Sequence, residues 1–424
     1  TLGEGKIETT VFVSFRSLSV HLNDDPNYGP VISSVQTSGY HRTLTEQEQK
    51  NSVKLSTVGA SVKWNIQNNH IAINGVHYHY SLPLLKRDEP YNLFSIKGNE
   101  WFNYSVDYSY TFRNYHFFGE EAIDKNGSRA FVNGMMATVD AAIDISILHR
   151  SISSQYQSVY GNAFTESTMP SNENGTYFGL SLKLNDFARL DFYADLFSFP
   201  WLRYRTDAPG FGVQYLAQLN YKPDKKVEIY SRLRWRSKPL NLPVVENQLN
   251  IPDDRTLANW RTNITFHVSR TLILRTRFDL SWFNITGQDA AKAGKKNSKE
   301  NTQYKQGGFL QYADVVYKPA HRWYSANFRF LVFETDGYDT RLYAYENDVP
   351  YSSSTPAFFG RGIRLCFNVK GNLPLRILKI FSVQPSLKIA RTIYANKSLD
   401  GYMLSKPGPT HKSDIKVQLL INCE

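Results

Sequence analysis

Residues 101–113 read WFNYSVDYSYTFR, and this stretch decides the fold. From residue 102 onward its large apolar and aromatic side chains occupy the even positions, and its small polar or charged side chains occupy the odd positions. A repeat of two residues places the two sets on opposite faces of an extended chain. The stretch therefore predicts a β-strand with one apolar and one polar face.

The same alternation recurs along the chain. It is found in residues 188–196, 211–221, 227–236, 257–268, 272–282, 309–317, 324–332, 363–370 and 415–423. Many strand candidates exceed the about 5–6 residues typical of soluble strands and reach the about 9–11 residues that a tilted membrane strand needs. Counting the candidates gives about 16–19 antiparallel strands.

The connections between the expected strands alternate in length. Tight hairpin turns are predicted at residues 67–70, 185–186, 223–226, 269–270 and 319–322. Long polar loops are predicted at about 84–100, 155–174, 239–255, 285–305, 335–356 and 395–412. Together with the long strands, this pattern predicts one all-β transmembrane outer-membrane β-barrel over residues 1–424, with short periplasmic turns and long extracellular loops. A stacked soluble β-protein is the alternative.

The composition agrees with this fold class. Hydrophobic residues make up 41% of the 424 residues and aromatic residues 14%, which excludes disorder over most of the length. No apolar run reaches the about 18 residues of a membrane-spanning helix. A mean hydropathy of −0.43 is compatible with a barrel, since only alternate side chains of a barrel strand face lipid.

Aromatic side chains on the apolar faces are expected to contact lipid, opposite the charged residues. These are Phe102, Tyr104, Tyr108, Tyr110, Phe211, Tyr215, Tyr221, Trp260 and Trp282.

Arginines on the opposite faces form the candidate functional site, a basic lining of the lumen. They are Arg232, Arg234, Arg236, Arg261, Arg275, Arg277, Arg329 and Arg364. Such a lining would favour the passage of anions or hold an acidic plug. The alternative, which we favour, is that acidic residues on the same faces neutralise it: Asp191, Asp195, Glu228, Asp279 and Asp314.

Other motifs in the sequence give little indication of catalysis, metal binding or disulfide formation. No GxSxG, HExxH or P-loop pattern occurs, so we expect no enzyme and no cofactor. His77 and His79 share a strand face, but no third ligand follows at a suitable spacing, and we expect no metal site. Cys366 and Cys423 do not make a disulfide framework. The formal charge of +11 would suit nucleic acid, lipopolysaccharide phosphates or anionic solutes.

One segment departs from the strand pattern. Residues 43–50, TLTEQEQK, have a capping-box spacing from Thr45 to Glu48, which predicts a helical turn, with a plain loop turn as the favoured alternative.

Two longer stretches resemble a known family. Residues 36–51, QTSGYHRTLTEQEQKN, and residues 341–364, RLYAYENDVPYSSSTPAFFGRGIR, resemble segments of Bacteroidota outer-membrane proteins that carry an N-terminal helix-hairpin-helix region of the competence type ahead of a barrel. The resemblance implies that the 424 residues are the C-terminal barrel portion and lack that N-terminal region. It also implies that nucleic acid would be contacted only through the missing region.

These observations predict an integral protein of the bacterial outer membrane that acts as a channel or as an accessory subunit of an envelope assembly. The expected partners are outer-membrane lipid and lipopolysaccharide, with other outer-membrane or periplasmic proteins as further candidates. A DNA-uptake component and a soluble β-rich binding protein are the alternatives.

Overall fold

A computed structural model describes residues 6–241, 252–285, 304–320, 322–374, 381–395 and 411–423. Its strands form a 21-stranded sheet with antiparallel neighbours, apart from one parallel bridge between β3 and β5, and a separate two-stranded pair. The prediction of an all-β, antiparallel fold is therefore confirmed.

The first half of the chain contains β1 (Lys6–Leu18), β2 (Val20–Asp25), β3 (Gly29–Val35), α1 (Leu44–Glu48), β4 (Val53–Ile66), β5 (Asn69–Leu84), η1 (Pro90–Asn92), β6 (Gly98–Phe112), β7 (Tyr115–Asp124), β8 (Arg129–Asp140), β9 (Ile143–Ile152), β10 (Glu173–Asn185) and β11 (Ala188–Phe199). The second half contains β12 (Gly210–Tyr221), β13 (Val227–Asn241), β14 (Pro252–His267), β15 (Leu272–Ile285), β16 (Tyr304–Tyr317), β17 (Tyr324–Thr335), η3 (Tyr338–Thr340), β18 (Leu342–Tyr343), β19 (Ala357–Phe358), β20 (Arg361–Gly371), β21 (Leu373–Pro374), β22 (Phe381–Tyr394) and β23 (His411–Cys423).

The chain divides into two compact units. Unit 1 comprises Thr1–Leu180, Tyr193–Val213 and Lys238–Pro252, and unit 2 comprises Ser181–Phe192, Gln214–Ser237 and Asp253–Glu424. Unit 1 thus holds β1 to β9, unit 2 holds β14 to β23, and the strands between them contribute to both.

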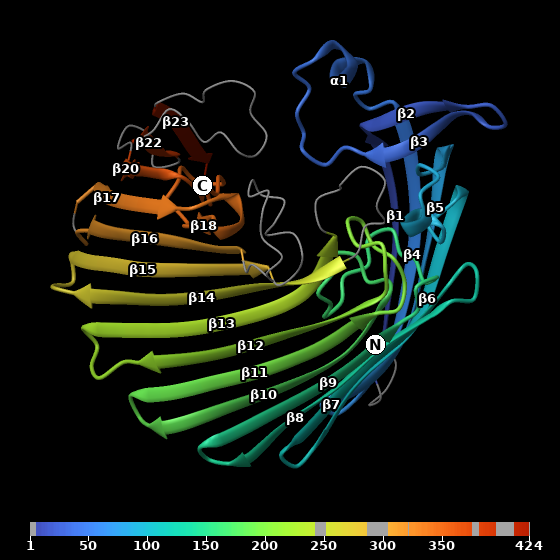
Figure 1. Cartoon of the computed structure of the whole chain (residues 1–424), viewed down its shortest axis with the longest axis horizontal. Coiled ribbons are helices and arrows are strands. Elements are labelled where there is room, and N and C mark those ends of the chain that lie inside the picture. Colours follow the sequence, from blue (N-terminus) through green and yellow to red (C-terminus); the bar gives the residue numbers. More distant parts are fainter. Residues whose placement is uncertain are drawn as a thin grey trace, which may run out of the picture. The chain divides into compact units, whose positions relative to one another are not determined.

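In unit 1, β4 to β9 follow one another as antiparallel hairpins, and β1 pairs with β4 over its whole length. The β2–β3 hairpin interrupts this order and packs against β4, β5 and β6 (Figure 1). Its contact is an apolar core in which Val20 and Ile32 of the hairpin meet Leu55, Tyr80 and Trp101. Burial of these large side chains holds the hairpin in place.

In unit 2, β14 to β17 form consecutive antiparallel hairpins, and β20, β22 and β23 continue the sheet from β17. Cross-strand partners in such a sheet point to the same side. Arg261 lies opposite Asp279, and Arg275 lies opposite Asp314, whereas Trp260 lies opposite Leu280. We call the side that holds these ionic residues the charged face and the other side the apolar face. In unit 1 the charged face is the side of the cross-strand partners Asp107 and Glu120, and the apolar face is the side of Ile73 and Val106.

The predicted turns agree closely with the structure. Described strands end and begin on either side of residues 67–68, 186–187, 222–226 and 268–271, as expected. Among the described elements, eighteen strands have ten or more residues, within the predicted 16–19, and the sheet is larger because β2, β3 and β21 are short strands. The predicted loops at 239–255, 285–305 and 395–412 lie largely outside the described residues.

Residues 44–48 form a helical turn, so the favoured prediction of a plain loop turn was wrong, and the predicted cap was two residues too late. Helix α1 has Thr43 as its N-cap, and the reciprocal capping bonds join Thr43 to Glu46 rather than Thr45 to Glu48. Both spacings satisfy the sequence rule, and only the backbone conformation of Thr43, with φ −98° and ψ 161°, distinguishes them.

Candidate functional site

An extended segment crosses the charged face of unit 2. Residues 341–356 lie within the connection from β17 to β20, and we call them the C-terminal strap. Alternate side chains of this strap point into the sheet, so that Leu342, Ala344, Glu346 and Asp348 are buried while Tyr343 and Tyr345 are exposed. The strap thus uses the same two-residue period as a strand to present one face to the protein.

Two arginines of the sheet bind the strap's backbone. Arg277 Nη2 donates to the carbonyl oxygen of Tyr343 at 2.7 Å, and Arg329 Nη1 donates to that of Tyr345 at 2.5 Å. Arg329 is also held by Asp314, its cross-strand partner, through two bonds of 2.6 and 2.7 Å. A guanidinium suits this task because its planar set of donors can serve a carboxylate and a carbonyl at once.

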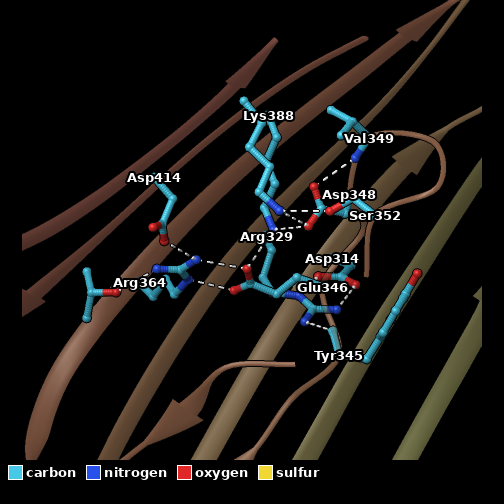
Figure 2. Close-up of polar contacts among 12 residues, drawn as sticks. Asp314, Arg329, Tyr345, Glu346, Asp348, Val349, Ser352, Arg364, Lys388 and Asp414 are labelled. Atoms are coloured by element: carbon cyan, nitrogen blue, oxygen red, sulfur yellow. Dashed lines mark hydrogen bonds and ion pairs between the residues drawn. The ribbon is translucent and has the colours of Figure 1, made fainter. Parts of the chain in front are cut away.

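The strap's two acidic side chains enter a cluster of basic groups from β20, β22 and β23 (Figure 2). Glu346 accepts two hydrogen bonds from Arg364, at 2.6 and 2.9 Å, and lies 3.2 Å from Lys388 Nζ. Asp348 accepts from Lys416 Nζ at 2.7 Å and from Lys388 Nζ at 3.3 Å. We call these residues, with Asp314, Arg329 and Asp414, the strap network.

The centre of the strap network is buried, and the network as a whole is balanced in charge. The side chains of Glu346 and Asp348 are 0% exposed, and those of Arg364 and Lys388 are 3% and 1% exposed. Four basic groups, Arg329, Arg364, Lys388 and Lys416, face four acidic ones, Asp314, Glu346, Asp348 and Asp414. Removing Arg364 or Lys388 would leave a buried carboxylate without full charge compensation, which is strongly destabilising.

Electrostatics around Asp348 favour its ionised form. Burial opposes ionisation, but hydrogen bonds from Lys416 and from the Val349 N–H, together with the charge of Lys388, hold the pKa of Asp348 below its usual value.

The strap also packs against the sheet through apolar side chains. Its Leu342 and Ala344 join an apolar core with Leu310, Leu331 and Phe333.

Unit 1 carries a second connection folded over its charged face. Residues 153–172 join β9 to β10, and we call them the N-terminal strap. Glu173 accepts from the N–H groups of Glu166 and Ser167 at 2.9 and 3.2 Å. The same carboxylate binds Arg150, which is fully buried and also bonded to Asp195 at 2.8 and 3.1 Å. A buried ion pair thus anchors this strap as well.

The structure brings some of the eight predicted arginines together and separates others. Arg277, Arg329 and Arg364 contact the C-terminal strap or its acidic groups, and Arg261 shares Asp279 with Arg277. Arg234 donates to Gln214 at 2.6 Å. Two further arginines, Arg232 and Arg236, lie on β13, and Arg275 lies on β15. Arg232 and Arg236 each interact with other residues. A basic lining of a lumen stays a prediction.

The predicted acidic neighbours do accept from basic groups. Asp279 and Asp314 pair with arginines of the list above, Asp195 pairs with Arg150, Asp191 with Arg189, and Glu228 with Lys222. Sequence reasoning missed Glu346, Asp348, Lys388 and Lys416, although the alternation in LYAYEND was a usable signal for the first two.

The other candidate chemistry is sparse. His77 and His79 are exposed on the apolar face of β5, and His79 Nδ1 lies 3.4 Å from Glu100. Within the described residues, no three His, Cys, Asp or Glu side chains are grouped as metal ligands. No described helix is long and apolar enough to cross a membrane.

Comparisons with known proteins give structural neighbours only. No protein-family model matches the sequence, and no curated protein is significantly similar to it. The outer membrane channel DcaP of Acinetobacter baumannii is similar at 9% identity and a TM-score of 0.34, over 83% of this chain and 94% of that one. OmpT, an outer membrane protein of Vibrio cholerae, is similar at 10% identity and a TM-score of 0.35, over 85% and 99%.

A third neighbour is the copper transporter OprC, at 11% identity and a TM-score of 0.45, over 92% of this chain and 62% of that one. All three TM-scores lie under 0.5, so these likenesses assign neither a function nor a residue role to this chain.

Proposed function

We propose that the chain is an integral outer-membrane β-barrel protein that acts as a channel, with its charged face toward the lumen and its straps narrowing the path. The observation that carries the proposal is the separation of the two faces. Apolar side chains exposed on the apolar face include Phe15, Trp64, Ile73, Val106, Phe278, Phe330, Phe367, Ile389 and Val417.

Such a surface is unsuited to water. Soluble monomers seldom expose a contiguous apolar patch above a few hundred Å², whereas a membrane strand must turn alternate apolar side chains to lipid. Seven of the nine aromatic residues expected to face lipid are exposed, and Phe102 and Tyr108 are half-buried. Tyr108 donates its hydroxyl to Asn133 at 2.8 Å.

The charged face supports the channel part of the proposal. Buried ion pairs and hydrogen-bonded amides are tolerated on a face that meets water or protein, and they are too costly on one that meets hydrocarbon. The two straps lie on this face in their respective units, so each would occupy part of the lumen. Because both are held by side chains and not by sheet pairing alone, substitutions can loosen them without breaking a strand.

The test is reconstitution of the full chain. We expect the protein to require detergent and to produce discrete conductance steps in planar lipid bilayers. A monodisperse protein without detergent would overturn the membrane assignment. Insertion into bilayers with no conductance, even after Glu346→Gln and Asp348→Asn loosen the C-terminal strap, would overturn the channel and leave the accessory role in an envelope assembly.

A further inference from the structure

A cavity of about 340 Å³ lies in unit 1, between the charged face of the sheet and the N-terminal strap. The sheet contributes Asn103, Ser105 and Glu120 to its lining, and the strap contributes Tyr156 and Tyr160. The volume is at the small end of the about 300–1,000 Å³ found for ligand pockets. A ligand of one or two sugar rings is therefore the appropriate size.

The strap wall of this cavity is held in place without a ligand. Trp101 Nε1 and Asn103 Nδ2 donate to the carbonyl oxygen of Gln157 at 3.0 and 2.9 Å, and Asp124 accepts from the Gln157 N–H at 2.9 Å. Trp101 and Tyr156 are themselves buried. A ligand would therefore bind a preformed site and lose little affinity to ordering of the strap.

Hydroxyl groups at the cavity have hydrogen-bonding capacity to spare. Ser105 Oγ accepts from Asn74 at 3.2 Å, and Ser158 Oγ accepts from the Gly161 N–H at 2.6 Å. In the part of the chain that the structure describes, neither hydroxyl hydrogen has an acceptor. Burial, with the nearby carboxylates of Glu120 and Asp124, raises the pKa of Tyr156 to about 12, so its phenol stays a donor.

The charges around the cavity disfavour an anion or an organic cation as its ligand. Glu120 lies on the charged face and, among the described residues, makes no hydrogen bond or ion pair, so it would repel an anion. The Arg16 guanidinium already lies 5.1 Å from the centre of the Tyr160 ring, so an organic cation would be repelled from the aromatic side. A neutral ligand with many hydroxyl groups can donate to Glu120, accept from the serines and place its C–H groups against Tyr78 and Tyr160.

We propose that this cavity is a binding site for a small neutral carbohydrate, the solute class of the channel. The assignment of the sugar as transported solute rests on the proposed function, whereas the binding itself does not.

The experiment is calorimetric titration of the full chain in detergent with glucose, galactose, mannose and maltose. We expect saturable binding of at least one of these sugars. Glu120→Gln, which replaces a charged acceptor by a neutral one, and Tyr156→Phe, which removes the phenol donor, should each weaken it about tenfold. Glu121→Gln is the matched control, because the neighbouring carboxylate points to the apolar face and its loss should leave the dissociation constant unchanged.

Three results would overturn the site: no saturable binding of any of the four sugars, binding of tetramethylammonium in place of the sugars, or binding that neither Glu120→Gln nor Tyr156→Phe weakens. Circular dichroism of each variant checks that the sheet is intact. Conductance is recorded separately. A protein that binds sugar without conducting ions contradicts the channel and keeps the sugar site. A protein that conducts ions without binding sugar keeps the channel and contradicts the sugar site.

Discussion

The side chain of Arg150 is enclosed by two carboxylates, and the stability it gives depends on all three groups. Its guanidinium donates to Glu173 at 2.7 Å and to Asp195 at 2.8 and 3.1 Å, with no exposed area of its own. Desolvation of such ions costs several kcal/mol each, and mutual attraction offsets this cost only while the set is complete. We infer that the cluster positions the N-terminal strap and adds little net stability.

Replacing Arg150 alone should therefore be severe. Arg150→Met leaves Glu173 and Asp195 buried without a counter-charge, and we expect it to lower the free energy of unfolding by about 3–5 kcal/mol. Urea titration of the protein refolded into lipid vesicles measures the change.

Two controls separate the buried charge from a general loss of packing. Combining Arg150→Met with Glu173→Gln and Asp195→Asn should restore most of the stability, because no ion is left unpaired. Arg189→Met, at an ion pair whose arginine is 62% exposed, should cost under about 1 kcal/mol. Similar losses at Arg150 and Arg189 would contradict the assignment.

At the scale of single elements, the sequence predicted strands and tight turns well, because both depend on local pattern. The two straps show where such reasoning stops. Residues 335–356 were predicted as a long loop, and LYAYEND alternates like a strand, yet its partners Arg364, Lys388 and Lys416 come from three other strands. Local periodicity states which side chains share a face and gives no information about what that face will contact.

Acid should loosen the C-terminal strap. The folded chain holds the pKa of Asp348 below the ordinary value of about 3.9, so the stabilisation is complete above that pH and is lost as pH falls through the lowered value. Hydrogen exchange of residues 342–352, corrected for intrinsic rates, should therefore accelerate when the pH is lowered from 6 to 3. Asp348→Asn should exchange fast at both pH values, and an acid response that persists in this variant would assign the effect to another group.

The apolar face should show a penalty that depends on depth. Phe278 lies at the middle of β15, while Phe266 is next to the end of β14. If the face contacts lipid, Phe278→Arg should cost about 2–4 kcal/mol and Phe266→Arg about 0–1 kcal/mol, each relative to the alanine variant. Refolding titrations in vesicles measure both. Equal penalties at the two positions would indicate a surface without a hydrocarbon gradient.

For the whole molecule, alternation and turn spacing were enough to predict the fold class, since they recur in nearly every strand. The β2–β3 hairpin was beyond this reasoning, because Val20 and Ile32 contact residues of later strands. The alternation correctly placed the arginines on one face of the sheet. Their role could not be predicted, because it depends on Glu346 and Asp348, which lie in a loop. The helix-hairpin-helix region and its link to DNA rest on the resemblance and stay predictions.

Charge balance in the strap network bears on the ion selectivity of the proposed channel. The formal net charge of the chain is +11, but the network itself pairs four basic with four acidic groups. The electric field along the path of a permeating ion then depends on small local differences between positive and negative charge. We therefore expect the unmodified channel to be only weakly anion-selective. Selectivity should respond to single charges, because the ring of groups that an ion passes determines it.

Opposite substitutions in the network should shift the reversal potential in opposite directions. Glu346→Gln with Asp348→Asn removes two negative charges and should raise anion selectivity, whereas Lys416→Gln, at a side chain 39% exposed, removes a positive charge and should favour cations. Planar bilayers under a potassium chloride gradient measure both, and Asp186→Asn, in an exposed turn, is the control for net charge alone. Shifts of the same sign, or none beyond the control, would mean that ions do not pass the network, and the strap would then be a plug that fixes the barrel for an accessory role.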